Sequence, residues 1–146
     1  MPRFVGVLLA LLALASPANA GDYGVPGHTY RHSYWNGTLP ACDTPQVLGR
    51  IAEKFAYADA HILYTGLGIA RIDRVRESLW KVGGPSLIDR RYCRATAWMT
   101  DGRKQEVIYL IEAGQGFASM GWNVESCLPS FDPWRVYDGW CRSIRP

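Results

Sequence analysis

Hydrophobic and polar residues alternate most regularly between residues 91 and 127, and this alternation predicts three consecutive β-strands. Residues 92–99 have an apolar face formed by Cys93, Ala95, Ala97 and Met99. Period-two alternation with one apolar face is typical of a half-buried strand. Residues 106–112 are apolar on both faces, which predicts a central strand. The third strand is expected over residues 117–127, with an apolar face formed by Met120, Trp122 and Val124.

Two glycine-containing turns separate these strands. Asp101-Gly102 predicts a type I′ hairpin turn, because that turn needs positive φ at both central residues. Residues 114–116 supply the second turn, and Gly121 within the third strand indicates a bulge or a close backbone approach. The three strands are therefore expected to form an antiparallel meander.

Residues 44–64 have the spacing of an amphipathic helix. Thr44 is placed to cap its N-terminus, and Pro45 suits the first helical position, where its missing N–H costs nothing. One apolar stripe is formed by Val47, Leu48, Ile51, Ala52, Phe55, Ala58 and Ile62. Gly66 is expected to end the helix. The stripe predicts that the helix lies across the sheet.

Residues 69–82 fit both a helix and a strand. Helical spacing is seen for Ile69, Ile72, Val75 and Leu79. Trp80 and Val82 instead suit a strand. Because a meander follows, we interpret the segment as a kinked first strand that pairs with residues 87–100. The expected fold class is α+β: one long helix packed on an antiparallel meander of about four strands, the layering that cystatin-like and NTF2-like folds use.

The first 20 residues have the features of a secretory signal peptide. Arg3 gives a positive start, residues 4–15 form an apolar run, and residues 18–20 form a small-x-small cleavage site. A buried N-terminal helix is the alternative. Gly21 follows the cleavage site, so no cysteine is present there for lipid attachment. No later apolar run approaches the ~20 residues of a transmembrane helix, and the mature chain is expected to be periplasmic or secreted.

Residues 21–41 are rich in glycine, proline and aromatic side chains and have no steady period, so we expect an irregular arm. A single α+β domain is expected over residues 42–146. Tyr30, Tyr34 and Trp35 are candidate partner-binding residues of the arm, with packing against the domain as the alternative.

Four cysteines in an exported chain predict two disulfides, for which three pairings are possible. We favour Cys127–Cys141, because both residues lie in the last segment and would tie the tail to the sheet. Cys42–Cys93 would then connect the start of the helix to the sheet. A zinc site is the alternative, but the sequence lacks the close C-x-x-C pair from which such sites are usually built.

Basic residues concentrate in residues 69–94, and Arg71, Arg91 and Arg94 are candidate anion-binding residues. Cross-strand ion pairs are the alternative explanation for this concentration. The mature chain is nearly balanced in charge, because removal of Arg3 leaves 15 of the 16 Lys and Arg residues against 13 acidic residues. This balance disfavours nucleic-acid binding, which needs a net basic face.

His61 lies near the end of the helical stripe and is a candidate for a site between helix and sheet; a structural role is the alternative. Trp134 and Trp140 lie outside the predicted strands and are candidate partner-binding residues. No nucleophile elbow, zinc-protease helix, Walker loop or dinucleotide-binding turn occurs in the sequence, so we predict no catalytic residue, metal ligand or cofactor.

Small secreted proteins of Gram-negative bacteria resemble this chain in five places: residues 92–97 (YCRATA), the Asp101-Gly102 turn, residues 122–127 (WNVESC), Val136-Tyr137 and the closing Cys141-Arg142. The resemblance covers about the last third of the chain. It implies an exported, disulfide-bonded protein and implies no activity.

The leading functional hypothesis is a non-catalytic periplasmic binding or accessory protein that docks on another cell-envelope protein through its aromatic arm and tail. One alternative is a small-molecule-binding or enzymatic site in the concavity between helix and sheet. Another is a secreted stress or inhibitor protein.

Overall fold

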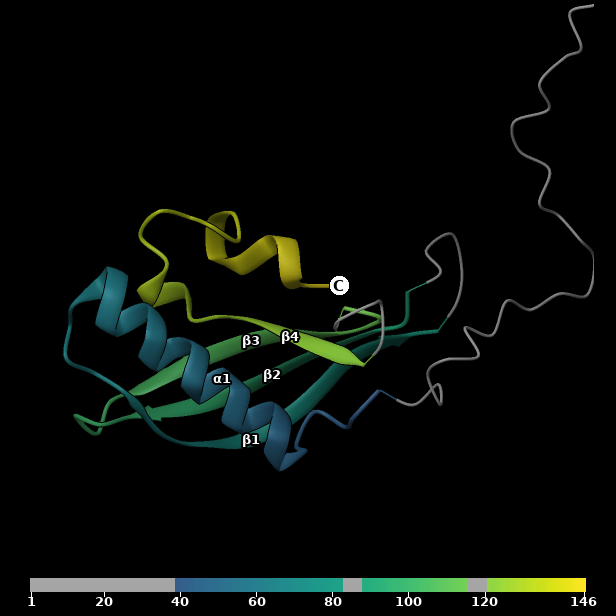
Figure 1. Ribbon diagram of the computed structural model, residues 1–146, viewed down its shortest axis with the longest axis horizontal. Helices are drawn as coiled ribbons and strands as arrows, with labels where there is room; N and C mark the ends of the chain where they lie inside the picture. The colour runs from purple at the N-terminus through teal and green to yellow at the C-terminus, as the bar shows by residue number, and fades with distance from the viewer. Residues whose placement is uncertain (1–38, 83–87, 116–120) are drawn as a thin grey trace, which may run out of the picture. The chain divides into compact units, whose positions relative to one another are not determined.

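The computed structural model describes residues 39–82, 88–115 and 121–146. Its elements in chain order are α1 (Pro45–Ala58), η1 (Asp59–Leu63), β1 (Ile69–Lys81), β2 (Arg90–Met99), β3 (Lys104–Ala113), β4 (Trp122–Cys127), η3 (Pro129–Phe131) and η4 (Gly139–Ile144). The strands form one antiparallel sheet in the order β1-β2-β3-β4. Figure 1 shows α1 lying across one face of this sheet. The predicted α+β class, with one helix on a four-stranded meander, is confirmed.

The main core lies between α1 and the sheet. Val47, Ile51 and Phe55 recur at one-turn spacing on α1 and are buried. They pack on a sheet face formed by Cys93, Ala95, Ala97, Met99, Val107, Tyr109, Ile111 and Val124. The alternation in β2 and β3 therefore places the predicted residues on the covered face. Leu39, three residues before Cys42, belongs to the same core.

The helical segment ends in a π-helical turn, η1, rather than continuing as an α-helix. The Tyr64 N–H donates to the Asp59 carbonyl five residues earlier at 2.8 Å, and Tyr64 then leaves the helix at φ 54°. The wider turn rotates Ile62 off the α-helical stripe, and its side chain is 52% exposed. The prediction that Ile62 belongs to the buried stripe is therefore wrong.

The predicted helix boundaries are confirmed, but the ends are held by different groups from those expected. Thr44 occupies the N-cap position, but its side chain makes no capping hydrogen bond; its carbonyl accepts from the Val47 N–H at 2.9 Å. The C-terminal end is closed by the Asp59 carboxylate, which accepts the N–H groups of Thr65 (3.0 Å) and Gly66 (2.9 Å). These bonds lower the pKa of Asp59, led by the bond from the Thr65 hydroxyl. Gly66 lies beyond the helix end.

The ambiguous segment of residues 69–82 is a strand, β1, and it is irregular as predicted. Its pairing with β2 shifts register at three places, one of them between Asp73 and Arg76, where Arg74 has φ 51°. Bulges of this kind bend an edge strand. Together with the charged side chains of β1, they discourage pairing with another chain.

The hairpin between β2 and β3 is not the predicted type I′ turn. The Gly102 N–H donates to Met99 O at 2.9 Å, the Met99 N–H donates to Arg103 O at 2.9 Å, and only Gly102 has positive φ (83°). Three residues therefore form the loop, with glycine in the left-handed position that closes a bulge. Asp101-Gly102 predicted the position of the turn correctly. The loop, however, has three residues rather than the two of a type I′ hairpin.

Both disulfides have the predicted pairing, Cys42–Cys93 and Cys127–Cys141. We call residues 128–146 the tail and the sheet face opposite α1 the outer face. The start of the tail, with Leu128 and Phe131, packs on the main core, and the Cys127–Cys141 disulfide holds its later part against the outer face. A second apolar cluster fills this contact: Tyr92, Ile108, Leu110, Cys127, Cys141 and Ile144. Figure 1 shows the tail folded back on the β3–β4 side of the sheet.

Candidate functional site

An apolar groove with a volume of about 290 Å³ lies between the end of the helical segment and the tail. We call it the α1–tail groove. Its apolar walls come from Phe55, Ile62 and Leu63 on one side and from Phe131, Trp134 and Val136 on the other. The two sides are far apart in sequence, so the groove exists only because the tail folds back beside α1.

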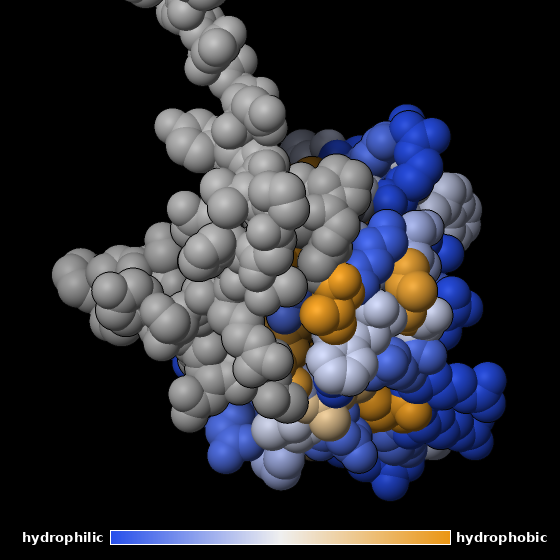
Figure 2. Space-filling model, turned by 90° about the vertical axis from the view of Figure 1, so that its right-hand side faces the viewer, coloured by the Kyte–Doolittle hydropathy of each residue, from blue (hydrophilic) through white to orange (hydrophobic). Residues whose placement is uncertain are grey.

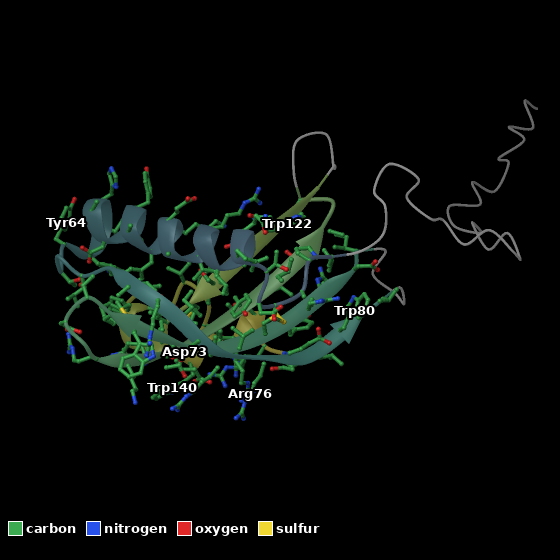
Figure 3. The ribbon with its side chains drawn as sticks, turned by 90° about the horizontal axis from the view of Figure 1, so that it is seen from below. Tyr64, Asp73, Arg76, Trp80, Trp122 and Trp140 are labelled. Carbon is green, nitrogen blue, oxygen red and sulfur yellow. A yellow bond between two sulfur atoms is a disulfide. The ribbon has the colours of Figure 1, made fainter. Side chains whose placement is uncertain are left out.

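The rim of the groove exposes large apolar side chains to solvent. Trp134 is 64% exposed, Val136 is 73% exposed and Ile62 is 52% exposed. Tyr64, at the same end of the helical segment (Figure 3), is also exposed. On the part of the right-hand side of Figure 1 that the coloured residues of Figure 2 show, apolar side chains form separate patches among hydrophilic ones. A grouping of exposed apolar side chains around one groove is typical of an interaction site.

The floor of the groove is continuous with the main core. The rings of Phe55 and Phe131 meet edge to face, with centroids 5.2 Å apart and an interplanar angle of 89°. Phe55 is buried in the core, and Phe131 lies in η3, which begins at Pro129. This ring contact fixes the floor, so the groove is largely formed without a ligand.

The tail backbone that carries the rim is held by one carboxylate. Asp132 accepts the N–H groups of Val136 at 2.8 Å and of Tyr137 at 3.1 Å. Arg135 lies in the turn between Asp132 and Val136 and has φ 55°. These bonds and the Cys127–Cys141 disulfide hold Val136 at the rim, which reduces the ordering cost of binding.

A polar cluster links the three elements at the side of the groove. The Glu125 carboxylate accepts the Tyr137 hydroxyl at 2.5 Å, Asn123 Nδ2 at 2.9 Å and Lys54 Nζ at 3.2 Å. Lys54 Nζ also donates to Val124 O at 2.6 Å. Because Lys54 is on α1, Glu125 on β4 and Tyr137 in the tail, the cluster ties the walls of the groove together.

This cluster shifts two pKa values in opposite directions. Burial alone would raise the pKa of Glu125, but the hydrogen bond from Tyr137 and the charge of Lys54 outweigh burial and leave that pKa below its usual value. Burial, followed by the bond to Glu125, raises the pKa of Tyr137. At neutral pH the glutamate is therefore ionised and the tyrosine is protonated.

Replacing Tyr137 with phenylalanine is expected to raise the pKa of Glu125. A carboxylate whose pKa is lower in the folded than in the unfolded state stabilises the fold above the unfolded value, about 4.3 for glutamate, and this contribution is lost as pH falls through the folded value. Tyr137→Phe should therefore destabilise the protein more at pH 7 than at pH 3, as measured by urea unfolding. An equal loss of stability at both pH values would contradict the charged cluster.

The sequence-predicted site residues do not form one site. Trp134 lines the groove, whereas Trp140 projects on the outer-face side with 79% exposure (Figure 3). His61 is exposed, stacks on Tyr57 with ring centroids 4.1 Å apart, and forms a 2.7 Å hydrogen bond with the Tyr57 carbonyl. Tyr30, Tyr34 and Trp35 lie outside the described residues.

The three candidate arginines lie on two different faces. Arg91 is buried on the α1 side, with its guanidinium 4.3 Å from the Trp80 ring centroid and 3.4 Å from Glu77. Arg71 and Arg94 lie on the outer face, opposite the core. The space between α1 and the sheet is filled by core side chains, and neither His61 nor these two arginines faces it. The structure therefore does not bring His61 and the three arginines together around one concavity.

Sequence reasoning missed most of the groove. Lys54, Glu125 and Phe131 had no motif to distinguish them, and Ile62 was assigned to the core stripe. The available signal was the excess of large apolar residues in the tail beyond β4.

Among the described residues, no group of three or more His, Cys, Asp or Glu side chains is arranged to hold a metal ion. None of the helices in the same ranges is long and apolar enough to cross a membrane. No protein-family model, curated protein or solved structure matches this chain.

Proposed function

We propose that the protein is a non-catalytic binding protein of the bacterial cell envelope and that its α1–tail groove holds apolar side chains of a partner protein. The observation that carries this proposal is the preformed groove of about 290 Å³, with Trp134, Val136 and Ile62 exposed at its rim. Small-molecule sites usually range from about 300 to 1,000 Å³ and enclose their ligand. An open groove just below that range is better suited to a few side chains of a protein.

The polar groups at the groove favour binding over catalysis. Lys54 is engaged by Glu125 and by the Val124 carbonyl. The Glu125 pKa is lowered and the Tyr137 pKa is raised, so neither group is tuned for proton exchange near neutral pH. Both groups instead act as fixed partners that hold α1, β4 and the tail.

The envelope location rests on the predicted signal peptide and on the two disulfides. Disulfides persist in oxidising compartments such as the periplasm and are rare in the cytosol. The resemblance of residues 92–97 and 122–127 to small secreted proteins of Gram-negative bacteria supports the same location. The arm residues Tyr30, Tyr34 and Trp35 remain a predicted second contact. A deletion that tests them should end at residue 38, because Leu39 belongs to the core.

Position-specific photo-cross-linking in the host cell tests this function. A photoreactive amino acid at Val136, on the rim, is expected to give one cross-linked product with another envelope protein. The same amino acid at Glu53, which is exposed on α1 outside the groove, serves as the matched control. Adding Ile62→Asp should abolish the Val136 product while the protein stays folded. Equal products at both positions, or a Val136 product unaffected by Ile62→Asp, would overturn the proposal.

A further inference from the structure

The tail covers only part of the outer face. Its buried residues Cys141 and Ile144 belong to one cluster with Ile108 and Leu110 of β3, Cys127 of β4 and Tyr92 of β2. The rest of β1 and β2 on this face stays open to solvent. The register of the strands places five exposed basic side chains on the outer face: Arg71, Arg76, Lys81, Arg94 and Lys104.

The carboxylates of the outer face are already engaged. Asp73 lies 3.3 Å from Arg71 and accepts the Trp98 indole N–H at 2.7 Å. Glu112 pairs with Arg90 at 2.7 Å, and Glu106 lies 3.8 Å from Arg145. In the described part of the chain, no carboxylate forms an ion pair with Arg76, Lys81, Arg94 or Lys104. The open part of the face therefore carries an uncompensated positive charge.

Basic side chains of neighbouring strands lie beside one another in two rows on this face. In the first, Trp98 of β2 stands between Arg71 and Lys104, each 4.4 Å from the indole ring centroid. In the second, Arg76 and Arg94 are direct partners on neighbouring strands. Like charges directly opposite each other destabilise a sheet. An anionic partner above the face would offset that repulsion, because it would interact favourably with both guanidinium groups.

A large aromatic side chain extends on the same side of the sheet. Trp140 is 79% exposed, and Figure 3 shows Trp140 and Arg76 on the side of the sheet opposite α1. Trp140 and Cys141 both have left-handed backbone conformations, with φ 60° and 58°. Such conformations are uncommon for residues other than glycine. The Cys127–Cys141 disulfide and the burial of Cys141 hold the tryptophan in this outward position.

We propose that the open part of the outer face binds the surface of an anionic lipid bilayer. The basic side chains are spread across three strands of a sheet rather than converging in a pocket, which matches a planar array of headgroups. Exposed tryptophan is favoured at the boundary between headgroups and acyl chains, where its ring is partly buried and its N–H stays solvated. Basic residues on one face strengthen such binding to anionic membranes.

Sedimentation with lipid vesicles tests this inference. The purified protein is mixed with phosphatidylcholine vesicles or with vesicles that also contain phosphatidylglycerol. Binding is expected only to the second kind and should weaken as salt is added, because salt screens exposed charges. Arg76→Gln combined with Arg94→Gln should weaken binding about 30-fold, given about tenfold for each 1.4 kcal/mol and about 1 kcal/mol for each basic residue near the surface.

The matched control removes the same charge elsewhere, with Arg50→Gln on α1 and Arg135→Gln in the tail. The control should bind phosphatidylglycerol vesicles within about twofold of the unmodified protein, a difference of about 0.4 kcal/mol. Trp140→Ser should weaken binding without changing its salt dependence. Urea unfolding confirms that each variant is folded. No binding to phosphatidylglycerol vesicles, or equal losses in the test and control variants, would overturn the inference. Neither result bears on the α1–tail groove, which uses different residues.

Discussion

Replacing both Cys42 and Cys93 with alanine is expected to lower the free energy of unfolding by about 4 kcal/mol. The two residues are 51 positions apart, and a cross-link over a longer loop removes more conformational entropy from the unfolded chain. Cys93 is fully buried against α1, so the bond also fixes the start of the helical segment to the sheet. Urea unfolding monitored by circular dichroism measures the loss.

The second disulfide provides the comparison. Cys127 and Cys141 are 14 positions apart, and their replacement with alanine should cost about 3 kcal/mol. The difference between the pairs is small, but their local effects should differ. Loss of Cys127–Cys141 should raise amide hydrogen exchange in the tail while β2 and β3 stay protected. If the shorter loop proved the more stabilising, or if its loss left the tail protected, the assigned role of the tail disulfide would be wrong.

Replacing Phe55 with alanine is expected to cost about 4 kcal/mol of stability, within the range of about 3 to 5 kcal/mol for phenylalanine in a core. Phe55 is 6% exposed and its ring meets Phe131 edge to face, so the change removes both a core contact and the floor of the groove. The cost should appear in urea unfolding as a lower midpoint at an unchanged slope.

Trp134→Ala is the matched aromatic control for Phe55→Ala. Trp134 lines the same groove but is 64% exposed, so its loss should change stability by no more than about 0.5 kcal/mol. A large loss of stability for Trp134→Ala would mean that the rim is part of the fold rather than a free binding surface. A small loss for Phe55→Ala would mean that the groove floor is not continuous with the core.

The strands and the disulfides were predictable because their signals are local or nearly so. Period-two alternation in residues 92–99 assigned Cys93 and Met99 to the covered face, and the position of Cys127 and Cys141 in one segment favoured their pairing. The same alternation also separates the arginines of this segment. Arg91 is two positions from Cys93 and therefore lies on the same face, the α1 side. Arg94 is one position from Cys93 and therefore lies on the outer face.

Other features depend on contacts that the local sequence does not specify. The π-helical turn that exposes Ile62 forms where the Asp59 carboxylate binds residues six and seven positions later. The bulge at Arg74 inserts one extra residue into β1 and so reverses which following side chains face outward. Arg76 therefore lies on the outer face together with Arg71. A one-residue shift of this kind moves every following side chain to the other face.

The groove was beyond prediction for a related reason. It requires the tail to fold back beside α1, and that position is set by Glu125, Tyr137 and Lys54, which come from three separate elements. The tail contributes to both proposed surfaces, since Trp134 lines the groove and Trp140 extends on the outer-face side. A protein bound in the groove and a bilayer on the outer face would therefore contact the same disulfide-anchored segment from different sides.

The most direct measurement of the central claim is the affinity of the cross-linked envelope partner for the protein, measured by calorimetry with unmodified protein, Trp134→Ala and Glu53→Ala. If the α1–tail groove is the binding site, Trp134→Ala should weaken binding about 30-fold, corresponding to about 2 kcal/mol for an aromatic hot spot. Glu53→Ala should leave the affinity unchanged. Equal affinities for the unmodified protein and folded Trp134→Ala would contradict the proposal that the groove holds the partner.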